Sequence, residues 1–193
     1  MQDYVIPSGF RIMVTGHRPK DLFGYDLSSS QYNGIRRVMA DIIQKAQDKY
    51  HDVSYISGMA LGADMLWAEE VYKRSLPLYA FIPFRHQAKV WNQKAQQHWQ
   101  ELIEYAISVH ITDDSSNPNI VRALHKRNED MIVNSDLCLA ICHEETVKRR
   151  ISSGERLGGT YGCMLSALKH GLKVFSYDPF VGSIKIFEKP FEA

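Results

Sequence analysis

Three glycine-rich turns contain the residues of this sequence whose types and spacing best suit chemistry. They are VTGHRP at 14–19, SGMALGAD at 57–64 and LGGTYG at 157–162. Each turn follows an apolar run and precedes a segment with helical spacing. Glycine turns that lead into helix N-termini present unpaired backbone N–H groups and the positive end of the helix dipole, which favours an anion such as phosphate. We expect the three turns to share one sheet edge and to form a cradle for a nucleotide.

The first turn offers three residues that suit an anionic ligand. Gly16 would let the backbone approach a phosphate, the Thr15 hydroxyl can donate a hydrogen bond, and Arg18 can bind a phosphate through two parallel hydrogen bonds. His17 titrates near neutral pH and is a candidate for acid–base catalysis. Two simpler interpretations stay open: a tight strand exit with a solvated Arg18, and a His17 that only hydrogen-bonds ligand or backbone.

The second turn combines two glycines, Gly58 and Gly62, with one acid. Asp64 stands at the start of the expected helix, where it either caps the helix or binds a ribose hydroxyl. It is the other candidate for a catalytic acid or base. A direct phosphate contact is not expected of it, because like charges repel.

The third turn, Gly158-Gly159-Thr160, opens the last long helix and is the best single candidate for a phosphate site. Close packing of the two glycines is the alternative. Catalytic residues stay unknown beyond His17 and Asp64, and no metal site or required cofactor is expected. The full set of candidate ligand-binding residues is Thr15, Gly16, His17, Arg18, Ser57, Gly58, Met59, Gly62, Ala63, Asp64, Pro83, Phe84, Gln87, Asn128, Asp136, Gly158, Gly159 and Thr160.

Composition sets limits on the class of protein. The chain has 193 residues, of which 45% are hydrophobic and 23% charged, and a net charge of +1. That balance is typical of a globular domain and makes binding to nucleic acid or to an acidic membrane surface unlikely. Its three cysteines lie in apolar runs without metal-type spacing, so we expect reduced core residues in a cytoplasmic protein. We expect no signal peptide and no membrane span.

Short apolar runs alternate with segments of helical spacing along the chain. The expected strands cover 10–14, 53–56, 78–82, 107–111, 137–142 and 172–176. The expected helices cover 28–50, 63–74, 87–106, 120–135 and 160–170. This alternation predicts one Rossmann-like, doubly wound α/β domain over 1–193, with a mainly parallel sheet and helices on both faces. Its core covers about 10–178, and 179–193 forms an edge hairpin or a tail.

These motifs, in this order and spacing, resemble the SLOG superfamily, and most closely its YpsA/YspA-like branch. The resemblance extends from the three turns to Pro83-Phe84 with Gln87, and to RNEDM at 127–131, and covers about residues 10–178. It implies a Rossmann-like fold that binds nucleotides or nucleotide-derived small molecules. Related branches include cytokinin-activating phosphoribohydrolases, the DNA-processing protein DprA, and sensors in bacterial conflict systems that read NAD-derived signals.

Two features depart from the family pattern. In phosphoribohydrolase relatives a catalytic glutamate follows the double glycine and threonine by one helical turn, whereas here YGCML at 161–165 contains no acid. The link at 143–157 is longer than usual and basic. We expect it to be a mobile lid that closes over an anionic ligand, with a disordered surface loop as the alternative. The candidate lid residues are Lys148, Arg149, Arg150 and Arg156.

The sequence leaves three functions open. The first is a sensor or sequestering protein, in a bacterial or phage conflict system, that binds an ADP-ribose-like or cyclic NAD-derived ligand without turnover. The second is a hydrolase that acts on a nucleotide or its glycosidic bond, and the third is a DprA-like nucleic-acid-binding protein. A homodimer or higher homo-oligomer is expected, with Trp99, Leu102 and Tyr105 as interface candidates.

Overall fold

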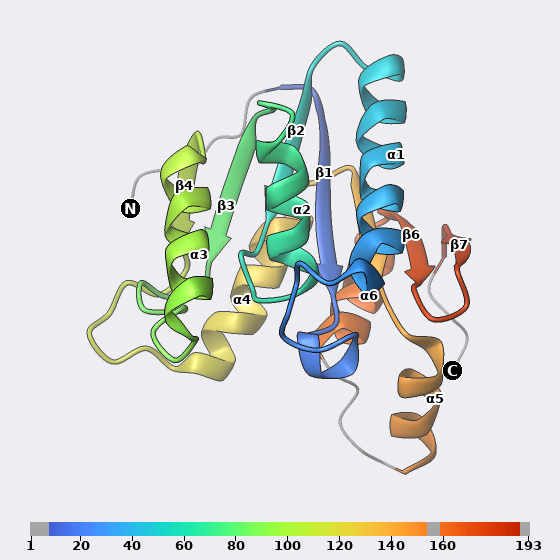
Figure 1. The fold of residues 1–193 in the computed structure, drawn as a ribbon. Coiled ribbons are helices and arrows are strands. Elements are labelled where there is room, and N and C mark those ends of the chain that lie inside the picture. The colour runs from blue at the N-terminus through green and yellow to red at the C-terminus, as the bar shows by residue number, and fades with distance from the viewer. Residues whose placement is uncertain (1–7, 154–158, 190–193) are drawn as a thin grey trace.

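The protein folds around one twisted sheet in the computed structural model, which describes residues 8–153 and 159–189 (Figure 1). Its strands are β1 (Phe10–Gly16), β2 (Val53–Ser57), β3 (Leu78–Ile82), β4 (Ser108–Ile111), β5 (Leu137–Ile141), β6 (Lys173–Asp178) and β7 (Ser183–Phe187). They lie in the order β4-β3-β2-β1-β5-β6-β7. All neighbouring pairs are parallel except β6 and β7. The expected α/β fold is confirmed, and the segment after β6 forms an edge hairpin.

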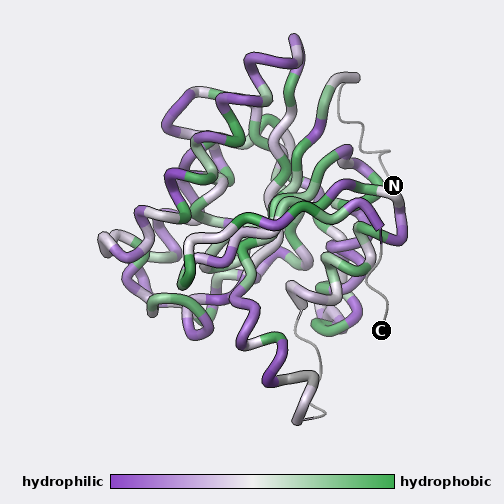
Figure 2. Tube along the Cα trace, turned by 90° about the vertical axis from the view of Figure 1, so that its right-hand side faces the viewer, coloured by the Kyte–Doolittle hydropathy of each residue, from purple (hydrophilic) through white to green (hydrophobic). Residues whose placement is uncertain are grey.

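The central strands are apolar along their whole length because helices cover both faces of the sheet. Every residue of β3 (LYAFI) and β5 (LCLAI) is buried. Figure 2 shows the hydrophobic residues gathered along the central strands and the hydrophilic ones on the outer helices. Strands buried on two faces need such continuous runs, which is why the runs were readable from the sequence.

The described part of the chain contains six α-helices (Figure 1). They are α1 (Asn33–Lys49), α2 (Ala63–Tyr72), α3 (Gln93–Tyr105), α4 (Ile120–Val133), α5 (Glu144–Ser152) and α6 (Gly159–Lys169). Met39 of α1, Trp67 of α2 and Leu102 of α3 belong to one apolar cluster. Ile132 of α4 and Ala167 of α6 belong to a second cluster. The two clusters fill opposite faces of the sheet.

The strand order reverses beside β1. The chain runs outward from β1 through β2 and β3 to β4, then returns to pair β5 with the free side of β1. Open α/β sheets bind ligands beyond the carboxyl ends of the strands at such a switch point. The fold therefore predicts a ligand site among the loops that follow β1, β2 and β5.

Helix α3 differs from its expected form in two respects. It begins at Gln93, because the Asn92 side chain accepts a hydrogen bond from the backbone N–H of Ala95 and caps the helix there. Trp99 and Leu102 are 8% and 1% exposed, so they pack into the core and do not form an outer interface. Trp99 and Leu102 are therefore wrong as interface candidates, whereas Tyr105 is only half-buried.

Helix α5 (Glu144–Ser152) lies within the 143–157 link, which the sequence predicted to be a mobile lid or, alternatively, a disordered loop. The backbone N–H of Glu144 donates a hydrogen bond of 2.9 Å to a carboxylate oxygen of Asp178, at the end of β6. That contact satisfies one of the unpaired donors of the first helical turn. Figures 1 and 2 show α5 projecting from the body of the domain.

Candidate functional site

A cavity of about 220 Å³ opens where β1 ends, beside the first residues of α2 and α6. The structure brings residues of all three glycine-rich turns to its wall. Helix α4 and Asp21, which ends a short 3-10 helix after β1, supply the remaining lining. The lining residues are Thr15, Gly16, His17, Arg18, Asp21, Ala60, Asp64, Leu124, Arg127, Asn128, Gly159 and Thr160.

The start of α6 gives the cavity a wall that suits an anion. Gly159 and Thr160 are the first two residues of this helix and both line the cavity. The first backbone N–H groups of a helix have no partner within the helix, and the dipole places partial positive charge there. Gly158 and Arg156 lie outside the described residues.

Arg127 and Asp64 form a buried ion pair at the base of the cavity. One Nη of Arg127 donates to a carboxylate oxygen of Asp64 at 3.1 Å, and the two side chains are only 7% and 8% exposed. The Nε of Arg127 has no hydrogen-bond partner in the part of the chain that the structure describes. Arg127 therefore keeps one buried N–H donor without a partner among the described residues.

Sequence reasoning alone missed Arg127 as a site residue, because a cation next to Lys126 also fits a solvated helix face. A signal was present: Ala123, Arg127 and Met131 are spaced by four residues, and all three are buried on α4. A cation on the buried stripe of a helix needs a partner, and Asp64 is that partner.

Arg18 places a second guanidinium at the cavity. Burial lowers the pKa of Arg18, the nearby charge of Asp64 raises it, and the charge of Arg127 lowers it again. The two arginines therefore repel each other across the site. A bound anion would relieve that repulsion and be attracted to both.

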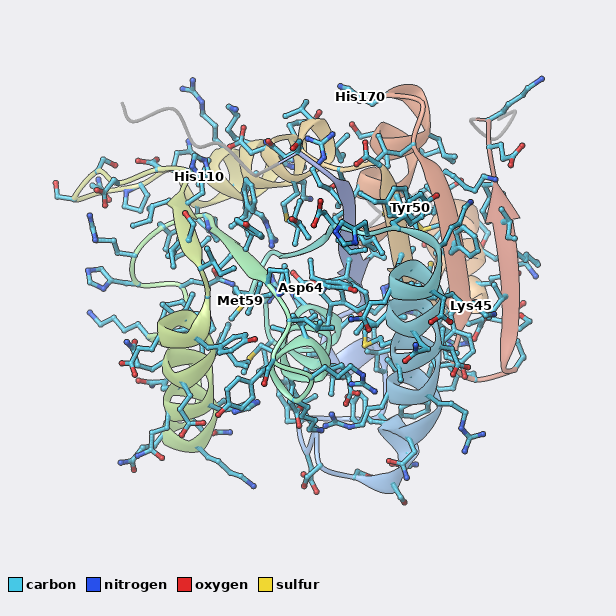
Figure 3. The ribbon with its side chains drawn as sticks, turned by 90° about the horizontal axis from the view of Figure 1, so that it is seen from above. Lys45, Tyr50, Met59, Asp64, His110 and His170 are labelled. Carbon is cyan, nitrogen blue, oxygen red and sulfur yellow. The ribbon has the colours of Figure 1, made fainter. Side chains whose placement is uncertain are left out.

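The second turn is held in an uncommon shape by side chains beneath the cavity. Met59 has a φ of +53°, in the left-handed region. The Ser57 hydroxyl accepts from the N–H of Met59 at 3.1 Å and donates to the carbonyl of Asp64 at 2.8 Å. Gln87 donates to the carbonyl of Met59 at 2.8 Å. Figure 3 shows Met59 and Asp64 close together in the centre of the domain. Ser57, Met59 and Gln87 thus shape the site without lining the cavity.

Two glycines of the turns are explained by packing. A Cβ on Gly16 would stand 2.3 Å from the Cβ of Ala63. Gly62 has a φ of +113°, and a Cβ there would stand 2.8 Å from the carbonyl oxygen of His17. These contacts bring the end of β1 against the start of α2, which is how the first two turns come to share one cavity.

Further expected site residues are absent from the cavity lining, namely Gly58, Gly62, Ala63, Pro83, Phe84 and Asp136. Asp136 precedes β5, so it lies at the opposite edge of the sheet, where it binds Arg11 of β1 through two hydrogen bonds of 3.0 Å. Its expected place in the site is wrong, because the amino ends of parallel strands share the other edge. Pro83 and Phe84 follow β3, one strand further from the switch point, and are not among the lining residues.

The described lid candidates do not line the cavity either. Lys148 is exposed on α5 and pairs with Glu145 at 2.8 Å, and Arg149 is also exposed. The side chain of Arg150 lies outside the described residues. Closure by this segment stays a prediction.

The cavity contains few groups suited to acid–base chemistry. Its lining groups of this kind are the His17 imidazole and the carboxylates of Asp21 and Asp64, and Asp64 is held by Arg127. The Thr15 side chain forms a hydrogen bond with the thiol of Cys163. Among the residues that the structure describes, no cluster of three or more His, Cys, Asp or Glu side chains could hold a metal ion.

A mainly parallel sheet whose strand order reverses beside β1, with helices on both faces, defines a Rossmann-like α/β domain. The chain belongs to the YspA SLOG family, whose model matches residues 12–153. Curated protein sequences gave no match. Within the described ranges, no helix has the length and apolar character needed to cross a bilayer.

Three solved structures share the fold. DNA processing protein A (DprA) from Streptococcus pneumoniae is 14% identical with a TM-score of 0.58, and the match covers 87% of this chain and 50% of that one. DprA from Helicobacter pylori is 13% identical with a TM-score of 0.59, and the match covers 89% of this chain and 70% of that one. TM1055, a structural genomics target, is 14% identical with a TM-score of 0.51, and the match covers 86% of this chain and 72% of that one. The chain thus spans half the length of the pneumococcal protein, and identities this low show the fold alone.

Proposed function

We propose that the cavity at the end of β1 binds the phosphate end of a nucleotide-type small molecule, with ADP-ribose and its cyclic relatives as the ligand class. One observation carries this proposal: two guanidinium groups, from Arg18 and Arg127, share a small cavity with the N-terminus of α6. Backbone amides and arginines are the donors that bind phosphate oxygens most strongly.

The size of the cavity suits only part of such a ligand. About 220 Å³ lies below the roughly 300 Å³ at which pockets for complete drug-sized ligands begin. A pyrophosphate fits such a volume, and the nucleoside parts would then lie across the rim. Asn128 and Asp21 also line the cavity, and their side chains would hydrogen-bond the ribose hydroxyls there.

Binding without turnover is the favoured mode of action, in a sensor or a sequestering protein. The Asp64 carboxylate is already occupied by Arg127, and the first turn of α6 carries no acid after Thr160. General acid catalysis needs a positioned carboxyl or imidazole. Hydrolysis through His17 and Asp64 is the alternative that the experiment below distinguishes.

Calorimetric titration with ADP-ribose, AMP and adenosine tests the proposal. We expect ADP-ribose and AMP to bind and adenosine to bind at least tenfold more weakly, because it lacks the phosphate. Arg18→Gln should lose about tenfold in affinity for ADP-ribose, the size of one charge-assisted contact. Arg122→Gln is the matched control, since Arg122 is exposed on α4 outside the cavity. Equal binding of adenosine and AMP would refute the phosphate site.

Turnover is then tested on the same samples. After incubation and denaturation, chromatography should return intact ADP-ribose. Recovery of AMP with ribose 5-phosphate (pyrophosphate cleavage) or of free adenine (glycosidic cleavage), abolished by His17→Ala with affinity retained, would establish the hydrolase instead.

Single-stranded DNA is a second candidate ligand, supported by the likeness to two DNA processing proteins. The Helicobacter pylori protein binds single-stranded DNA. This likeness weakens the expectation against nucleic acid that rests on a net charge of +1. Fluorescence anisotropy with a labelled oligonucleotide at two salt concentrations tests the candidate: a DNA-binding protein loses affinity steeply as salt rises.

A further inference from the structure

A second cavity, of about 320 Å³, lies at the opposite edge of the sheet from the candidate site. It is formed by the first residues of β1, β5 and β6 and by the last turns of α1. Figure 3 looks onto this edge and labels Lys45 and Tyr50 beside it. The two cavities share no residue.

The lining of this second cavity is mostly apolar, with aromatic rings prominent in it. The rings of Phe10 and Tyr50 stack with their centroids 3.9 Å apart and an angle of 11° between their planes. Phe175 of β6 and Ile42 of α1 also line the cavity, and all four side chains are only partly buried. Half-covered aromatic residues around an open hollow leave flat apolar surface for a planar partner.

Three lysines stand around the same cavity, from two elements: Lys45 and Lys49 of α1, and Lys173 of β6. Lys173 is paired with Glu188. Neither Lys45 nor Lys49 forms an ion pair with any residue in the described ranges, although the ammonium of Lys49 lies 5.0 Å from the ring centroid of Tyr50.

The single acidic residue of the lining does not offset these charges. Asp136 is bound by the guanidinium of Arg11 through both carboxylate oxygens and also accepts from the backbone N–H of Arg11. Lysines in the last turns of a helix complement its dipole, and that accounts for some of the preference for Lys45 and Lys49. It does not account for an apolar, aromatic hollow directly between them and Lys173.

We propose that this second cavity binds a small planar aromatic anion. The aromatic body would lie against the stacked rings of Phe10 and Tyr50, and the carboxylate, sulfonate or phosphate group would meet Lys45 and Lys49. Two unpaired ammonium groups at the rim of an apolar hollow complement that combination of flat surface and negative charge.

The test compares 2-naphthoate with its uncharged analogue 2-naphthamide, by ligand-observed NMR and by calorimetry on the full chain. Native protein should bind 2-naphthoate saturably and more tightly than 2-naphthamide. The double variant Lys45→Gln/Lys49→Gln should bind 2-naphthoate about fivefold more weakly, the combined effect of two exposed ion pairs. Its affinity for 2-naphthamide should equal that of the native protein.

Two further variants make the result decisive. Lys89→Gln/Lys94→Gln removes two exposed lysines elsewhere and should leave both affinities as in native protein. Ile42→Trp should fill the hollow and weaken both ligands together, with folding checked by a thermal melt. The proposal is overturned if 2-naphthoate shows no saturable binding, if it binds the double variant as it binds native protein, or if 2-naphthamide binds equally well. Since the two cavities share no residue, these outcomes are independent of ADP-ribose binding.

Discussion

The guanidinium of Arg127 occupies the space into which any residue other than glycine at position 58 would project its Cβ. A Cβ on Gly58 would stand 1.3 Å from Nη1 of Arg127 and 2.7 Å from a carboxylate oxygen of Asp64. The second glycine-rich turn and α4 are therefore fitted to each other. Arg127 reaches the candidate site only because the turn has no side chain at this point.

Gly58→Ala should displace Arg127 and destabilise the protein. The added methyl group cannot coexist with the guanidinium, and moving it leaves Asp64 without its buried partner. We expect the free energy of unfolding to fall by about 2 kcal/mol or more, measured by urea denaturation. Gly162→Ala is the control, because a Cβ at this position on α6 would meet nothing within 4 Å. It should be neutral or stabilising, by up to about 1 kcal/mol. Equal effects of the two substitutions would contradict the fitted arrangement.

Arg127→Met should lower the free energy of unfolding more than a double substitution that removes both charges of the pair. The single substitution leaves the 8%-exposed Asp64 carboxylate uncompensated, at a cost of about 3–5 kcal/mol. Adding Asp64→Asn should recover a large part of that loss. Denaturant melts of both single variants and the double variant give the coupling free energy, and strict additivity would show that the pair contributes nothing as a unit.

Asp136→Asn should lower stability without affecting ligand binding. The substitution removes the charge that holds Arg11, and with it the tie between the first residues of β1 and β5. Since both side chains are about one third exposed, we expect a loss of about 1 kcal/mol. Titration with ADP-ribose should give the native affinity, because Asp136 lies at the far edge of the sheet. A large loss of affinity would mean that the two edges are coupled.

Stability should depend on pH through Glu69 and His98, which link α2 to α3. Burial opposes the charge of Glu69, but hydrogen bonds from His98, Lys73 and Arg36 lower its pKa to about 2. The charged carboxylate is therefore favoured by folding, and its stabilisation is complete above about pH 4.5 and lost as the pH falls toward 2.

His98 gives the opposite dependence. The hydrogen bond to Glu69 raises the pKa of His98, burial opposes the rise, and Glu101 adds to it. This contribution is complete below pH 6.5 and disappears as the pH rises through the higher pKa of the folded state. Native protein should therefore melt at a higher temperature than His98→Gln, and this difference in melting temperature should be larger at about pH 6 than at about pH 9. A constant difference across that range would exclude a charged His98.

The cysteines should resist alkylation until the protein unfolds. Burial raises the pKa of Cys163 to about 11, although the hydrogen bond with Thr15 and the charge of Arg127 oppose the rise. Burial also raises the pKa of Cys138, and Cys142 is 3% exposed. Mass spectrometry after iodoacetamide treatment at about pH 8 should find unmodified native protein and three modifications in urea. Rapid labelling of folded protein would contradict the buried positions.

The sequence predicted the parts of the fold that depend on local pattern. Apolar runs predicted the buried strands, and the carboxyl ends of parallel strands necessarily share an edge, so the convergence of Thr15, Asp64 and Thr160 on one cavity was readable. The same reasoning shows why placing Asp136 in the site was wrong: it precedes its strand and so lies at the opposite edge of the sheet. Both inferences need only strand order and direction.

Contacts between distant segments account for what the sequence did not reveal. The start of α5 is capped by Asp178, 34 residues later in the chain, and no local pattern predicts that partner. The burial of Arg127 depends on Gly58 and Asp64, which lie on a different element. Such pairs become visible only when the strands and helices are already placed.

The unusual backbone of Met59 has a consequence for affinity. A residue in the left-handed region relaxes unless its surroundings hold it, and here hydrogen bonds from Gln87 and to Ser57 do so with Met59 fully buried. The turn is consequently rigid before any ligand arrives. A molecule that enters the cavity at the end of β1 meets a turn that is already ordered, so its binding energy is not consumed in ordering this loop.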